Sequence, residues 1–241
     1  MERDEWVFVY GGSSKQNLLE SNITPHTHHL CISPASCGQY ATQLLRASGY
    51  KVVTTCSPRN FAHLTALGAS AVVDFHGPHA EVVQDIKAAT GDTIQFAIDC
   101  ISTKASQQIA QDVIKPGGGK VLILLGPEEI EVRADVVRIR ESSPRAMWNL
   151  KFVHSSHSLT AMLLYTALGR PFTMFGTDFP AAPSDKAQIA AFCETMPRLV
   201  EQGRLKPNPL KTWEGGLAAI PEGLQYIKEG KNSAEKLVYR L

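Results

Sequence analysis

The sequence lacks several features that would assign it to a specialised class of protein. It has no Cys-x-x-Cys pair and only five widely spaced cysteines, which argues against a disulfide framework or a structural zinc site and favours a reducing, cytoplasmic location. It has no excess of one charge, since 24 basic and 23 acidic residues leave +1, so a nucleic-acid-binding protein is not expected. It has no apolar run near the roughly 20 residues of a transmembrane helix, and its charged start excludes a secretory signal.

What the sequence does contain is a regular alternation of apolar runs with longer amphipathic stretches. Strands are predicted at 6–10, 51–56, 71–74, 93–99 and 120–125, with a sixth around 152–153. Helices are predicted at 38–48, 58–67, 80–89, 104–114 and 159–168. Because strands that alternate with helices build βαβ units, we expect an α/β fold with a doubly wound parallel sheet.

The alternation ends after about residue 175. A helix over 185–202, another over 218–228 and a last strand over 236–240 do not continue the strand–helix repeat. We therefore predict a dinucleotide-binding domain over 1–178, and in 179–241 a second domain that the chain contains only in part.

A dinucleotide site is predicted where the first strand meets the first helix. In doubly wound sheets, glycines there let the backbone approach the pyrophosphate, and the helix N-terminus supplies free N–H groups. Gly12 and Ser13 follow the first strand, and Gly38 opens the helix. The stretch 14–37 separates these two parts, where about four residues are expected.

Three interpretations of residues 14–35 remain open. The first is a metal site in 26–31, whose histidines and cysteine are zinc ligands but lack an ordered turn between ligand pairs. The second is a translated intron, because codons for 14–15 can contain the donor sequence GTAAG and codons for 34–35 the acceptor CAG. Excision would then preserve the frame and leave one threonine. The third is a genuine surface insertion.

The end of the second strand favours NADP(H) over NAD(H). Enzymes that use NAD usually place Asp or Glu there to bind the ribose 2′-hydroxyl. This chain instead has Ser57, Pro58, Arg59 and Asn60. Ser57 and Asn60 can hydrogen-bond a 2′-phosphate, and Arg59 can neutralise it. A serine followed by proline is also good helix-capping chemistry, and the two roles are compatible.

Several motifs together are typical of the medium-chain dehydrogenases/reductases. They are Val9-Tyr-Gly-Gly-Ser13 joined to Gly38-x-Tyr-Ala-Thr-Gln-Leu44, the segment 57–60, Leu67-Gly-Ala-Ser-Ala-Val-Val-Asp-Phe75 and Lys115-Pro-Gly-Gly118. The C-terminal motifs within 213–217, 221–226 and 230–239 are typical of one group within this superfamily. The chain resembles the zinc-independent, trans-acting enoyl reductases of fungal polyketide biosynthesis, without the GroES-like catalytic domain that precedes the first strand in that family. The resemblance implies a Rossmann domain, with 179–241 as the remnant of the GroES-like domain.

The resemblance also implies an activity and its partners. A hydride would pass from NADPH to the β-carbon of an α,β-unsaturated acyl thioester, presented by an acyl carrier domain of a polyketide synthase. No catalytic side chain is assigned, and no metal is expected. Two other functions remain open, namely a catalytically inactive nucleotide-binding or synthase-docking fragment, and a quinone or enone reductase of the same superfamily.

Binding residues follow from the resemblance by position. The cofactor would contact Gly12, Ser13, Ser36, Cys37, Gly38, Ser57, Pro58, Arg59, Asn60, Phe75, Leu125, Gly126, Asn232 and Ser233. The acyl chain would lie along Tyr165, Thr166, Ala167, Leu168 and Gly169. For Tyr165 and Leu168, ordinary packing of a helix face is an equally good explanation.

Overall fold

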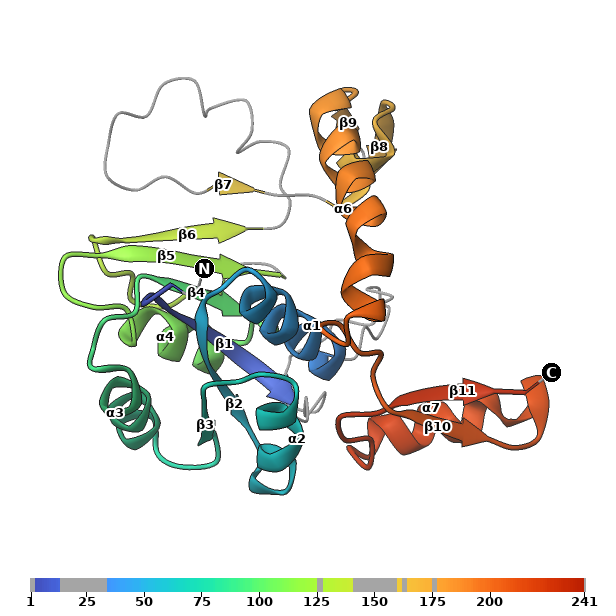
Figure 1. Cartoon of the computed structure of the whole chain (residues 1–241), viewed down its shortest axis with the longest axis horizontal. Helices are drawn as coiled ribbons and strands as arrows, with labels where there is room; N and C mark the ends of the chain where they lie inside the picture. Colours follow the sequence, from blue (N-terminus) through green and yellow to red (C-terminus); the bar gives the residue numbers. More distant parts are fainter. Residues whose placement is uncertain are drawn as a thin grey trace.

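The main body of the molecule is a parallel sheet with helices on both faces (Figure 1). The computed structural model describes residues 3–13, 34–124, 128–140, 160–161, 164–174 and 177–240. Within these residues the sheet has seven strands in the order β3-β2-β1-β4-β5-β6-β7. The strands are β1 (Trp6–Ser13), β2 (Lys51–Cys56), β3 (Ala71–Asp74), β4 (Phe96–Asp99), β5 (Gly119–Ile123), β6 (Val136–Arg140) and β7 (Thr160–Ala161).

The helices of this body follow the predicted alternation. They are α1 (Pro34–Ala47), the 3-10 turn η1 (Pro58–Asn60), α2 (Phe61–Ala66), α3 (His79–Thr90) and α4 (Lys104–Asp112). The sequence therefore predicted the α/β class and the doubly wound parallel sheet correctly. No helix in the described ranges is both long and apolar enough to cross a bilayer.

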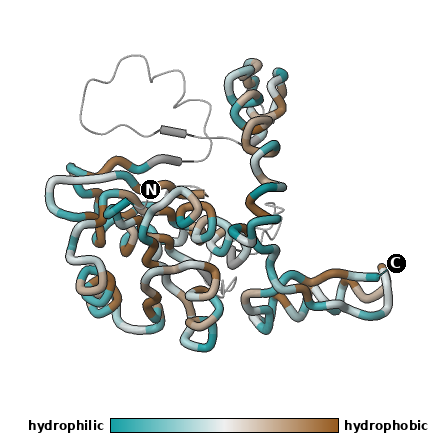
Figure 2. The backbone as a smooth tube through the Cα atoms, viewed as in Figure 1, coloured by the Kyte–Doolittle hydropathy of each residue, from teal (hydrophilic) through white to brown (hydrophobic). Residues whose placement is uncertain are grey.

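The core lies between the sheet and the helices. Its largest buried side chains include Phe8 on β1, Ile86 on α3, Ile114 after α4 and Ile123 on β5, each fully buried. Figure 2 shows the hydrophobic stretches concentrated along the strands. Strands that are apolar on both faces are expected when helices cover both sides of a parallel sheet, so the burial matches the sequence pattern.

Among the described residues of the main body, β6 and β7 were not predicted and one predicted helix is wrong. The sixth strand is β6, at Val136–Arg140, whereas the predicted strand at 152–153 lies outside the described residues. The helix predicted over 159–168 is wrong, because the structure has only β7 and the short 3-10 helix η3 (Leu164–Leu168) in the described part of that range.

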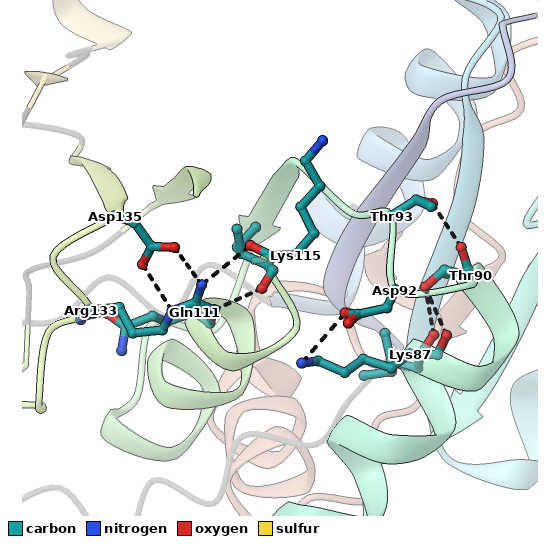
Figure 3. Close-up of polar contacts among 10 residues, drawn as sticks. Lys87, Thr90, Asp92, Thr93, Gln111, Lys115, Arg133 and Asp135 are labelled. Carbon is teal, nitrogen blue, oxygen red and sulfur yellow. Dashed lines mark hydrogen bonds and ion pairs between the residues drawn. The ribbon is translucent and has the colours of Figure 1, made fainter. Parts of the chain in front are cut away.

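A polar clamp explains why β6 forms where it does (Figure 3). The guanidinium of Arg133 donates to the carbonyl oxygens of Gln111, Ile114 and Lys115 at the end of α4, and it pairs with Asp135. The side chain of Gln111 in turn binds the backbone of residues 131 and 133. These contacts tie the segment before β6 to α4, so the chain enters the sheet beside β5.

The C-terminal elements lie on the side toward which the parallel strands point (Figure 1). They are the hairpin β8 (Phe172–Met174) and β9 (Thr177–Phe179), α6 (Pro183–Glu201), β10 (Leu210–Trp213), η4 (Gly216–Ala219), α7 (Ile220–Lys228) and β11 (Lys236–Tyr239). The strands β10 and β11 form a separate parallel pair. Much apolar surface here is exposed, including Leu210, Leu217 and Leu224. A domain boundary at 178 stays a prediction.

Candidate dinucleotide-binding site

The end of β1 lies at the point where the strand order of the sheet reverses. β1 pairs with β2 on one side and with β4 on the other. The chain builds the sheet outward from β1 to β3 on one side, and then crosses over to build β4 to β7 on the other side. In open α/β sheets, ligands bind in the crevice outside the carboxyl ends of the strands at this switch point. The predicted loop at Gly12 and Ser13 is therefore at the topologically expected place.

Two buried threonines of β2 hold the end of β1. The hydroxyl of Thr54 donates to the carbonyl oxygen of Val9 at 2.8 Å, and the N–H of Gly11 donates to the Thr55 hydroxyl at 3.0 Å. Gly11 has φ +85, in the region that favours glycine, and the pairing with β2 shifts register between Val9 and Ser13. The strand thus bends at the glycines that the sequence singled out. The two threonines were not predicted as part of this site.

The N-terminus of α1 begins earlier than predicted. The helix starts at Pro34, so Ser36 and Cys37 lie in its first turn and residues 34–35 are helical. The first N–H groups of a helix have no partner within it, and this first turn has no acidic residue to repel an anion. Within the described residues, the buried Ser36 hydroxyl has no hydrogen-bond partner. An unpartnered hydroxyl beside free N–H groups suits a diphosphate.

The next part of the site brings together residues that are far apart in the sequence. At the end of β2, Ser57 and Asn60 are buried, whereas Pro58 and Arg59 are exposed. The side-chain amide of Asn60 donates to the hydroxyl of Ser233 at 3.1 Å. Ser57 occupies the N-cap position of η1, but its side chain makes no capping hydrogen bond. The capping explanation for its side chain is therefore not supported.

Two further predicted residues flank this cluster. Within the described chain, the Oδ1 atom of Asn232 is buried and has no hydrogen-bond partner. Phe75, at the end of β3, is half-buried and stacks on His76 with ring centroids 4.1 Å apart. The unpartnered oxygens of Ser36 and Asn232 are polar groups that a dinucleotide could satisfy, so the residues present fit such a cofactor.

Asp99 is the last residue of β4, the strand that pairs with β1 on the side opposite β2. Its carboxylate accepts from the N–H groups of Ile101 and Ser102, both at 2.9 Å, and from the hydroxyl of Ser106 at 2.8 Å. Burial raises the pKa of Asp99 to about 6, and these three hydrogen bonds only partly offset that rise. Asp99 therefore organises the loop after β4 and is half-ionised near pH 6.

The predicted contacts at the nicotinamide end, Leu125 and Gly126, lie outside the described residues. Both flanks of this segment are anchored. The N–H of Leu124 donates to the hydroxyl of Ser102 at 3.1 Å, and the N–H of Glu128 donates to the Oε1 of Gln107 at 3.1 Å. Ser102 and Gln107 were not predicted as part of this site, because nothing local distinguishes them from other polar residues near α4.

The predicted acyl segment, Tyr165 to Gly169, lies within and just after η3, which packs against α6. Thr166 is 9% exposed, and Ala167 is half-buried. Tyr165 and Leu168 are each 51% exposed, and the Tyr165 ring lies 6.1 Å from that of Phe172. The structure thus groups the segment with the C-terminal elements. An acyl-binding role stays a prediction.

A cavity of about 660 Å³ lies elsewhere on the molecule. It is lined by the C-terminal ends of α1 and α2 and by Gly203, Arg204 and Lys206. Because α1 starts at the carboxyl end of β1 and runs back along the sheet, its C-terminal end lies at the opposite edge. This cavity is therefore separate from the candidate site.

The described residues do not fit a zinc ion. Across the ranges that the structure covers, no group of three or more His, Cys, Asp or Glu side chains could hold a metal. The histidine-rich segment 26–31 lies outside those ranges. No step of the chemistry considered below involves a metal.

A protein-family model described as zinc-binding dehydrogenase matches residues 37–160, just over half of the chain. The chain belongs to this family. It is also a member of the medium-chain dehydrogenase/reductase superfamily that its motifs predicted, and it is similar to trans-enoyl reductases. The family match begins within the first turn of α1 and ends at β7. It therefore covers most of the parallel sheet.

Curated relatives of this family member match it along most of its length. A trans-enoyl reductase of Macrophomina phaseolina is 32% identical, over 97% of this chain and 54% of the relative. A trans-enoyl reductase of Penicillium citrinum is 30% identical, over 100% of this chain and 55% of the relative. A zinc-type alcohol dehydrogenase-like protein of Schizosaccharomyces pombe is 29% identical, over 99% of this chain and 56% of the relative. The chain spans about half the length of these relatives.

Solved structures confirm the fold. The CurK enoyl reductase is similar with a TM-score of 0.58 and 16% identity, over 100% of this chain and 56% of that one. A mycobacterial protein complexed with NADPH gives a TM-score of 0.59 and 16% identity, over 100% of this chain and 59% of that one. At this level of identity the likeness establishes the α/β architecture alone.

Proposed function

We propose that this chain is the nucleotide-binding part of an NADPH-dependent oxidoreductase of the enoyl reductase type. The observation that carries the proposal is the polar cluster at the end of β2, where the buried Asn60, next to the buried Ser57, donates to the half-buried Ser233. This strand ends without the carboxylate that usually selects NAD. The names of the relatives, trans-enoyl reductases, support the reaction class.

Each part of the site has a role in this proposal. The N-terminus of α1, with Gly12, Ser13, Ser36, Cys37 and Gly38, binds the diphosphate through N–H groups and the helix dipole. The 2′-phosphate lies against 57–60 with Ser233, and Arg59 supplies the countercharge. Phe75 lies beside the adenine. The unpartnered Oδ1 of Asn232 accepts a hydrogen bond from a cofactor group. Leu125 and Gly126 lie at the nicotinamide.

When bound, NADPH supplies a hydride to the β-carbon of an α,β-unsaturated acyl thioester. The protein's contribution is to bind and orient the two reactants and to exclude water. We propose that the thioester is presented by an acyl carrier domain of a polyketide synthase, with the acyl chain along Tyr165 to Gly169. A quinone or other enone as substrate of the same hydride transfer is the alternative.

Replacing Ser57 by aspartate tests the cofactor proposal. Ser57→Asp places a carboxylate where the 2′-phosphate is expected, so NADPH affinity should fall at least about tenfold, which is about 1.4 kcal/mol. NADH has no 2′-phosphate, and its affinity should not fall. Thr65→Asp adds the same charge on the exposed surface of α2 and should change neither affinity.

Fluorescence titrations of the purified chain with NADPH and NADH measure these affinities. Equal losses for both cofactors in Ser57→Asp would contradict the assignment of the 2′-phosphate site. Reduction of an enoyl thioester by the chain in the same cuvette supports the enoyl reductase proposal, whereas NADPH binding without turnover supports the nucleotide-binding fragment.

A further inference from the structure

A single buried amide joins three parts of the molecule. Gln39, in the first half of α1, is one of the largest fully buried side chains, at 1% exposure. Its Nε2 donates to the carbonyl oxygen of Ala234 at 3.2 Å, and its Oε1 lies 2.9 Å from Nε2 of His63 on α2. The side chain therefore links α1, α2 and the loop between α7 and β11. Nothing in the sequence motifs singled out this residue.

The linked loop carries predicted cofactor contacts. Ala234 directly follows Asn232 and Ser233, and Ser233 receives the hydrogen bond from Asn60. Ala234 has φ +56, a conformation that residues with a side chain adopt reluctantly and that neighbouring contacts must hold. The hydrogen bond from Gln39 to the Ala234 carbonyl is one such contact. Gln39 thus contacts the same loop whose Ser233 meets Asn60.

We propose that Gln39 is a positioning residue that sets the preference for NADPH. It holds the 232–234 loop so that Ser233 meets Asn60, and the two side chains together bind the 2′-phosphate. Gln39 acts through Ala234 and His63 and is assigned no contact with the cofactor itself. This inference rests on the proposed function, because it assumes that the cluster at the end of β2 binds NADPH.

Gln43, one turn further along α1, provides a matched control. It is also a buried glutamine, and its side chain also binds the C-terminal part of the chain. Its Nε2 donates to the carbonyl oxygen of Lys206 at 3.2 Å, and its Oε1 accepts from the N–H of Lys206 at 2.7 Å. Its Nε2 also donates to the backbone carbonyl oxygen of Gln39 at 3.3 Å, a contact that does not involve the Gln39 side chain. Gln43 therefore has similar burial and similar bonding, but the C-terminal segment that it holds carries no predicted cofactor contact.

The decisive comparison is between Gln39→Leu and Gln43→Leu. Both variants lose buried hydrogen bonds, so both should unfold at lower urea concentrations than the parent chain. In Gln39→Leu the dissociation constant for NADPH should rise about tenfold and that for NADH about twofold, so the preference for NADPH falls about fivefold. In Gln43→Leu the ratio of the two constants should stay unchanged. An unchanged ratio in Gln39→Leu, or an equal change in both variants, would overturn the proposal.

His63 offers a milder change if Gln39→Leu does not fold. His63→Leu removes only the contact from α2, at a half-buried position, and should lower the preference for NADPH about threefold. No change in the ratio there would also count against the proposal.

Amide hydrogen exchange of the free proteins separates this inference from the proposed function. Loss of Gln39 should speed exchange of the amides in 232–235, and loss of Gln43 should speed exchange around 205–207 instead. If the parent chain binds neither cofactor, the proposed function fails, and the preference assigned to Gln39 fails with it. If the parent binds NADPH but exchange in 232–235 is unchanged in Gln39→Leu, only the inference fails.

Discussion

The carboxylate of Asp99 is buried where the loop after β4 turns away from the sheet. Its pKa is raised to about 6 in the folded chain, above the value near 3.9 of an exposed aspartate. The folded state therefore binds a proton more tightly than the unfolded state. The stability that this group contributes is fully present below about pH 4, and it is lost as the pH rises through about 6.

Asp99→Asn should remove this dependence on pH. The amide oxygen can still accept from Ile101 and Ser102, and the amide nitrogen can donate to the hydroxyl of Ser106. Between pH 4.5 and pH 7 the parent chain should lose on the order of 2 kcal/mol of unfolding free energy that the variant keeps. Urea titrations at both pH values measure this difference.

Glu194→Gln removes an exposed carboxylate on α6 and serves as the control. Its unfolding free energy should depend on pH in the same way as that of the parent chain. If Asp99→Asn showed the same loss between the two pH values as the parent, the buried charge would not be the cause.

Single residues of the candidate site were predictable only where a local motif marks them. Ser57 and Asn60 follow a strand directly, so their place at the carboxyl edge follows from the strand itself. Gln39 and Thr55 have equally specific contacts, but their partners lie 195 and 44 residues away along the chain. No local pattern encodes such a partner, and only the folded chain reveals it.

Among the secondary-structure elements, β5 depends on the glycine turn that precedes it. Gly117 and Gly118 have φ of +90 and +94. Gly119 begins the strand, and a methyl group there would overlap the carbonyl oxygen of Gln95 and the side chain of Ile114. At Gly117 the same methyl group would meet nothing within 4 Å. The glycines at 117 and 119 are thus required for different reasons, backbone conformation and space.

Gly119→Ala should destabilise the fold by about 3 kcal/mol, because the contact is with backbone inside a paired sheet that cannot easily move. Gly117→Ala should cost about 1 kcal/mol, from its positive φ alone. Thermal and urea unfolding of the two variants compare these effects directly. Equal losses would mean that the close approach to Gln95 does not constrain the sheet.

The elements that the sequence predicted well are those with a strong apolar run and clear boundaries. The bounds of β2 and β3 agree residue for residue, because each is a short apolar strand bounded by polar or turn residues. The strands β6 and β10 were missed, since both are short and carry charged residues within them. Their pairing is determined by long-range contacts such as the Arg133 clamp, which propensity does not encode.

At the scale of the whole molecule, the C-terminal elements approach the sheet at the edge where the cofactor is proposed to bind. The hydrogen bonds from Gln39 and Asn60 to Ala234 and Ser233 make this approach specific. Several apolar side chains of α6 and α7 are exposed, including Phe192, Val200 and Leu224. That residues 179–241 form part of a second domain stays a prediction. The arrangement of these elements against α1 was not predictable, because it depends on buried amides.

Amide hydrogen exchange of the chain with and without saturating NADPH measures whether the dinucleotide rests between β1 and α1. We expect slower exchange on NADPH addition in residues 10–13, 34–40, 57–61 and 231–235, because these segments line the proposed site and are protected together only if the dinucleotide rests between β1 and α1. No change in these segments, or protection confined to the cavity at the other end of α1 near residues 203–206, would contradict it.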